Sequence, residues 1–84
     1  SADVKSGVDA WGQGNYDKAV KEWRQPALDG NADAQFNLGQ AYKLGRGVKS
    51  NLDVAMDWYS KAARLHPACR LHRAVWRRWI NSFC

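Results

Sequence analysis

The chain has 84 residues, of which 45% are hydrophobic and 25% charged, a composition that suits one small globular domain. No apolar run approaches the roughly 20 residues that a membrane-spanning helix needs, so a transmembrane protein is not expected. The net charge of +5 divides unevenly, because residues 1–65 contribute +1 and residues 66–84 contribute +4. Any contact with nucleic acid or a membrane surface is therefore expected only in residues 66–84, and neither is favoured as the function.

An internal repeat organises the body of the chain. A shift of 36 residues superposes Trp23 on Tyr59, and a shift of 31 superposes Gly14 on Gly45. The two shifts differ by five residues, which matches five additional residues, 46–50, in the second copy. The sequence thus predicts two helix–loop–helix units, with a short loop in the first and a longer loop in the second.

The first helix of the second unit is predicted over residues 32–44, because its apolar positions keep the spacing of one buried helical face. These positions are Ala34, Leu38, Ala41 and Tyr42. Gly45 and Gly47 should end this helix, since glycine adopts positive φ at low cost.

The second helix of that unit should begin just after residue 50, with Asn51 or Asp53 as its N-cap. A second apolar stripe marks its buried face: Leu52, Ala55, Met56, Tyr59, Ala62 and Ala63. No segment alternates strictly between apolar and polar residues as a half-buried strand would. The predicted fold class is all-α.

The residues of the second unit resemble a complete Sel-one-like repeat, which belongs to the tetratricopeptide superfamily. The matching positions are Ala32, Ala34, Gln35, Asn37, Leu38, Gly39, Tyr42, Gly45, Gly47, Val48, Asp53, Ala55, Trp58, Tyr59, Lys61, Ala62 and Ala63. Residues 7–30 resemble the shorter, tetratricopeptide-like first unit of such proteins. Pro26 would remove a backbone donor and loosen its helix near residues 22–23, but the resemblance includes a proline there and implies that the helix accommodates it.

This resemblance implies an α/α solenoid of about two helix–turn–helix repeats, and a single domain with three parts. Residues 1–30 form the first unit, 31–66 the Sel-one-like repeat, and 67–84 a basic, Trp-rich terminal helix. The resemblance suggests a bacterial type of repeat protein, while periplasmic, secreted and cytoplasmic locations all stay open.

The terminal segment has an apolar face that suits one of two roles. Its self-association or capping residues are predicted to be Leu71, Val75, Trp76, Trp79, Ile80 and Phe83. They could cover the end of the solenoid, as repeat arrays require, or pair with a second copy in a homodimer or domain-swapped dimer, since two units leave a small core.

No constellation of residues predicts catalysis, so the chain is not expected to be an enzyme. No cofactor or metal is expected either, because His66, Cys69, His72 and Cys84 lack the spacing of a known zinc module. On one continuous helix Cys69 and Cys84 would lie about 22 Å apart, too far for a disulfide.

The predicted function is a scaffold that binds a partner protein or peptide on the concave helical surface; self-association through the terminal helix is the alternative. In tetratricopeptide proteins the first helix of each pair lines that surface. Its partner-binding residues here would be Lys5, Asp9, Asp33, Phe36, Asn37, Gln40 and Lys43. Phe36 lies off the buried stripe, so it is either half-packed or an exposed anchor.

Overall fold

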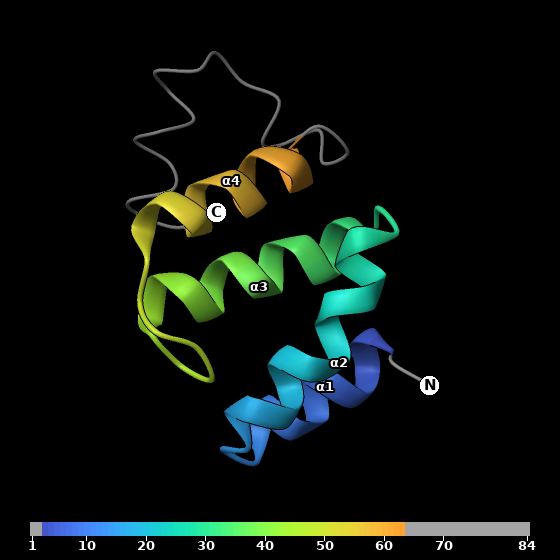
Figure 1. Ribbon diagram of the computed structural model, residues 1–84. Coiled ribbons are helices and arrows are strands. Elements are labelled where there is room, and N and C mark those ends of the chain that lie inside the picture. Colours follow the sequence, from blue (N-terminus) through green and yellow to red (C-terminus); the bar gives the residue numbers. More distant parts are fainter. Residues whose placement is uncertain (1–2, 64–84) are drawn as a thin grey trace.

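The computed structural model describes residues 3–63, which form four α-helices. They are α1 (Val4–Gly12), α2 (Tyr16–Leu28), α3 (Ala32–Leu44) and α4 (Leu52–Ala63). Each helix packs against the next along the chain, so that α1 and α2 lie together at one end, α3 in the middle and α4 beyond it (Figure 1). No strand occurs within residues 3–63, and the predicted all-α class is confirmed. The terminal helix expected over residues 67–84, with its capping or self-association residues, lies outside the described residues.

Asparagine side chains begin three of the four helices. The Oδ1 atoms of Asn15, Asn31 and Asn51 accept hydrogen bonds from backbone N–H groups three residues later, at 3.4, 3.0 and 3.2 Å. Each bond satisfies a donor that the first turn of a helix leaves unpaired. Of the two caps considered for α4, Asn51 makes the bond.

One glycine ends the first helix of each unit, and the two glycines occupy equivalent places. Gly14 follows α1 with φ of 81°, and Gly45 follows α3 with φ of 69°. This left-handed conformation is costly for residues with a Cβ atom, so glycine allows both helices to end sharply. The superposition of Gly14 on Gly45 in the sequence repeat therefore corresponds to an equivalent turn.

The buried residues form two clusters, one among α1, α2 and α3 and one between α3 and α4, and many of them are alanines. Ala19, Ala34 and Ala41 are fully buried, and Ala34 and Ala41 belong to the buried face that the sequence predicted for residues 32–44. Trp23 and Tyr59, superposed by the repeat, are each only 3% exposed. Leu52 was predicted to belong to the buried stripe of α4, and this is wrong: its side chain is 62% exposed. As the first residue of α4, it precedes the turns that pack against α3.

In both units a large aromatic ring packs against a glycine of the preceding helix. A Cβ atom on Gly7 would collide with the Trp23 indole, and one on Gly39 would lie 2.6 Å from Tyr59 Cε1. The Trp23 Nε1–H donates to the Val4 carbonyl at 3.1 Å, which fixes the indole across α1. The two helices of each unit therefore approach so closely only because glycine is present at these positions.

Between the units, α2 and α3 are joined by a buried hydrogen bond. The Nε2 atom of Gln35, which is 5% exposed, donates to the Ala27 carbonyl at 3.0 Å. This carbonyl lies in the last turn of α2, where backbone acceptors lack partners within the helix. Pro26 lies inside α2, and the helix continues to Leu28 as the resemblance implied.

Candidate functional site: a pocket between the first helices of the two units

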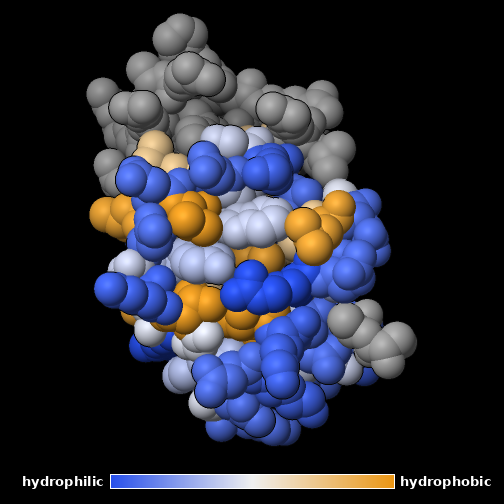
Figure 2. Space-filling model, viewed as in Figure 1, coloured by the Kyte–Doolittle hydropathy of each residue, from blue (hydrophilic) through white to orange (hydrophobic). Residues whose placement is uncertain are grey.

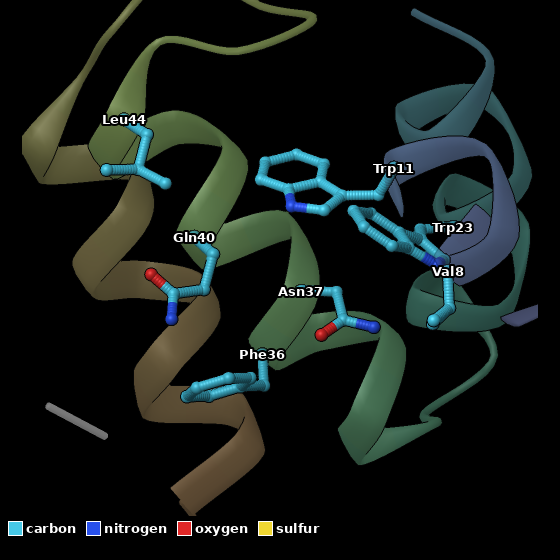
Figure 3. A pocket seen from close by; sticks show the side chains of 7 residues that line it. All are labelled: Val8, Trp11, Trp23, Phe36, Asn37, Gln40 and Leu44. Carbon is cyan, nitrogen blue, oxygen red and sulfur yellow. The ribbon is translucent and has the colours of Figure 1, made fainter. Parts of the chain in front are cut away.

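An open pocket of about 240 Å³ lies between α1 and α3, with α2 contributing to its wall (Figure 3). Its lining residues are Val8, Trp11, Trp23, Phe36, Asn37, Gln40 and Leu44. Pockets for whole small molecules usually measure roughly 300 to 1,000 Å³. This smaller volume suits one or two side chains of a partner protein.

Aromatic rings give the pocket its shape. The Trp11 ring lies 5.4 Å from the buried Trp23 ring, centroid to centroid, at an angle of 37°. On the opposite side, Phe36 packs against Tyr59 of α4 with centroids 5.5 Å apart. Phe36 is half-buried, so of the two alternatives from the sequence the half-packed one is found. Its ring nevertheless borders the pocket, as Figure 3 shows.

Two exposed aliphatic side chains form the rim. Val8 of α1 is 49% exposed and Leu44 of α3 is 50% exposed. Apolar side chains on both helices thus face solvent beside the buried aromatic rings, in a surface that is otherwise hydrophilic over much of the view in Figure 2. Clustered apolar and aromatic groups of this kind are typical of protein-interaction sites.

Polar contacts in the pocket come from two carboxamides. The Tyr59 hydroxyl donates to Gln40 Oε1 at 3.0 Å, which leaves the Nε2 hydrogens of Gln40 available to a partner. Burial raises the pKa of Tyr59 to about 12, so this hydroxyl stays protonated and able to donate at neutral pH. Among residues 3–63, the Asn37 carboxamide has no hydrogen-bond partner. Both amides can therefore bind a polypeptide without supplying charge.

No charged side chain lines the pocket within the described residues. Of the seven residues predicted to bind a partner, Phe36, Asn37 and Gln40 line it, whereas the four charged ones, Lys5, Asp9, Asp33 and Lys43, do not. Lys5, Asp9 and Asp33 are exposed on α1 and α3, and Lys43 is partly buried. The predicted binding roles of all seven stay predictions, but the structure brings together only the uncharged three.

Four lining residues were not predicted from the sequence: Val8, Trp11, Trp23 and Leu44. Leu44 could have been predicted from the sequence, because it lies four residues after Gln40 and eight after Phe36 and therefore on the same helical face. Val8 and Trp11 are likewise three residues apart in α1. The sequence offered no signal that Trp23, on the second helix of its unit, reaches the pocket.

Other site classes receive no support from this part of the chain. Residues 3–63 contain no group of three or more His, Cys, Asp or Glu placed to hold a metal ion. The histidines and cysteines weighed as metal ligands, His66, Cys69, His72 and Cys84, lie outside that range. None of the four helices is long and apolar enough to span a membrane.

Comparison with known proteins identifies a family that the second unit resembles. The Sel1 repeat family matches residues 32–67, which include both α3 and α4. A rat protein, DAP3-binding cell death enhancer 1, is 40% identical over 48 residues. That match covers 57% of this chain but only 9% of the rat protein, so the chain spans less than a tenth of that relative. No solved structure matches the chain.

These findings confirm the resemblance of the second unit to a Sel-one-like repeat, whereas the tetratricopeptide-like character of residues 1–30 and the bacterial origin stay predictions. Sel1 repeats have an all-α, tetratricopeptide-like solenoid fold and generally mediate protein–protein interaction without catalysis. Residues 32–67 of this chain match the Sel1 repeat family, and the pocket lies where the first helix of this matched unit faces the first helix of the preceding unit.

Proposed function

We propose that this chain is a non-catalytic interaction module that binds a segment of a partner protein across α1 and α3, with an apolar side chain of the partner in the pocket. The observation that carries the proposal is the uncharged, aromatic lining of that pocket. An aliphatic or aromatic side chain loses water there without leaving a charge unpaired. The membership of α3 in a Sel1 repeat supports a protein rather than a small molecule as the partner.

The carboxamides give the proposed site its polar specificity. Gln40 is held by Tyr59 and presents two N–H donors, and Asn37 presents both a donor and an acceptor. A partner's backbone in an extended conformation offers the matching N–H and C=O groups beside the inserted side chain. Charged residues at the ends of α1 and α3 would then contribute at the rim, where ion pairs add little affinity.

A matched pair of leucines tests the proposal. Leu44 and Leu28 are each the last residue of a helix and are 50% and 70% exposed, but only Leu44 lines the pocket. Peptides that bind the intact chain would be selected from a displayed random library, and their affinities measured by fluorescence anisotropy for Leu44→Ser and Leu28→Ser. We expect Leu44→Ser to weaken binding roughly ten-fold, the effect of losing about 1.4 kcal/mol of apolar contact.

The selected peptides supply a second criterion. They should share an aromatic or large aliphatic residue whose replacement by Ser abolishes binding, whereas Leu28→Ser should leave affinity within about two-fold. Peptides that share only charged residues, or equal losses in both leucine variants, would refute the proposed pocket. Circular dichroism of both variants checks that the helices are retained.

A further inference from the structure

A second surface, on the other helix of the first unit, is distinguished by its charge. Residues 3–63 contain eight Lys or Arg and eight Asp or Glu, so this part of the chain is neutral as a whole. Yet Lys18, Lys21 and Arg24 follow one another at intervals of three along α2, around a shallow hollow of about 580 Å³. The only acidic residue lining this hollow among the described residues is Asp17. Although residues 3–63 are neutral as a whole, cations are therefore in local excess on this face of α2.

The α3–α4 loop borders the hollow through Gly47 and packs against the beginning of α2. Gly47, in that loop, has φ of 77°, and a Cβ atom there would lie 2.5 Å from the Tyr16 carbonyl oxygen and 2.8 Å from Val20 Cγ2. The loop therefore lies directly on the first turns of α2. Its neighbour Arg46 places its guanidinium carbon 5.1 Å from the Tyr16 ring centroid, within the range of a cation–π contact.

The cations on α2 are available to a partner. Lys18, Lys21 and Arg24 are exposed, and neither lysine forms an ion pair with any residue in 3–63. Arg24 Nη2 donates to the Tyr42 hydroxyl at 3.3 Å, which positions the guanidinium while leaving its other donors unused. The lower part of the view in Figure 2 is largely hydrophilic.

We propose that this basic face, formed by Lys18, Lys21 and Arg24, binds an acidic, Asp- or Glu-rich segment of a protein partner. Opposite charge provides the attraction, and the row along α2 matches an extended chain better than a single small anion. Nucleic acid fits less well, because Asp17 interrupts the positive field and no aromatic side chain among the described residues lines the hollow for a base to stack on. The basic face shares no lining residue with the pocket between α1 and α3, so binding at the basic face can be tested independently of the proposed function.

The test uses a fluorescein-labelled decapeptide of glutamate, with fluorescence anisotropy on the full chain. We expect Lys18→Gln/Lys21→Gln to bind about five-fold more weakly than the unaltered chain, and affinity to fall when NaCl is raised from about 50 to about 200 mM. Glutamine is as good a helix former as lysine, so α2 should persist. The control, Lys5→Gln/Lys61→Gln, removes the same charge elsewhere in residues 3–63 and should lose less than about two-fold.

Two further measurements identify the location and the kind of partner. Amide NMR shifts on addition of the peptide should be largest within residues 15–24 and 46–47. Leu44→Ser should leave binding unchanged, because it alters only the other pocket. Equal losses in both lysine pairs, shifts confined to residues 66–84, or tighter binding of a dT10 oligonucleotide with the same variant sensitivity would each overturn the proposal.

Discussion

Gly39→Ala provides the sharpest test of the close packing between α3 and α4. Alanine is a better helix former than glycine by about 1 kcal/mol, so helix propensity alone predicts a more stable protein. The added Cβ atom, however, would lie 2.6 and 2.7 Å from Cε1 and Cδ1 of Tyr59. Carbon atoms pack at roughly 3.5 to 4 Å, so the ring would have to retreat by about 1 Å.

The Tyr59 ring has little freedom to move. It is 3% exposed, and its hydroxyl donates to Gln40 at 3.0 Å. Overpacking costs about 1 to 3 kcal/mol, and weakening the hydrogen bond adds about 1 kcal/mol. After the gain in propensity, Gly39→Ala should lower the free energy of unfolding by about 2 kcal/mol and the Tm by roughly 10 °C.

Urea denaturation followed by circular dichroism measures this change. Gly12→Ala is the matched control, since Gly12 is also helical and a Cβ atom there would meet nothing within 4 Å. That variant should be as stable as the original chain or slightly more so. In a Tyr59→Leu background, Gly39→Ala should become neutral or stabilising because the ring is gone. A Gly39→Ala protein at least as stable as the original would refute the packing argument.

Three further outcomes follow from single polar contacts. Gln35→Glu should destabilise the fold by about 2 kcal/mol or more at pH 7, because a buried carboxylate would face the Ala27 carbonyl, and acidification to pH 4 should restore part of the loss. The pKa of Tyr59 is about 12 in the folded chain and near 10 in the unfolded chain. The free energy of unfolding should therefore be unaffected by this group below pH 10 and should decrease as the pH rises towards 12. Tyr59→Phe should reduce that decrease, as urea titrations at each pH would show. Asn31→Ala should cost about 1 kcal/mol in the same assay by removing the bond to the Ala34 N–H, whereas Asn37→Ala, in the middle of the same helix, should cost less. Each argument fails if its variant matches the original chain.

The sequence was sufficient to predict the helices and the repeat. Ala34, Leu38 and Ala41 define the buried face of α3, and Gly45 ends that helix as predicted. The superposition of Trp23 on Tyr59 correctly paired the two buried aromatic residues that cross their preceding helices. These features are local, because periodicity, capping and positive φ depend on residues a few positions apart.

The candidate site was only partly predictable. Phe36, Asn37 and Gln40 lie on one face of α3, so helical geometry groups them, but the charged residues predicted beside them lie outside the pocket lining. Apart from Leu44 of α3, the lining residues that were not predicted come from α1 and α2, and Trp23 reaches the pocket only because Gly7 allows its indole to cross α1. The angle and separation of two units cannot be read from either unit alone.

The sequence by itself determined that residues 3–63 fold as helix–loop–helix units, because the signals for helix, turn and repetition are contained within short stretches of chain. Only the tertiary structure decided which residues share a surface. It set the uncharged side chains of α1 and α3 around one pocket, and it placed Arg46 of the α3–α4 loop over Tyr16 at the beginning of α2. The physical reason is that pockets and charged faces arise from the packing of separate helices, and that packing depends on which side chains, or missing Cβ atoms, meet where the helices cross.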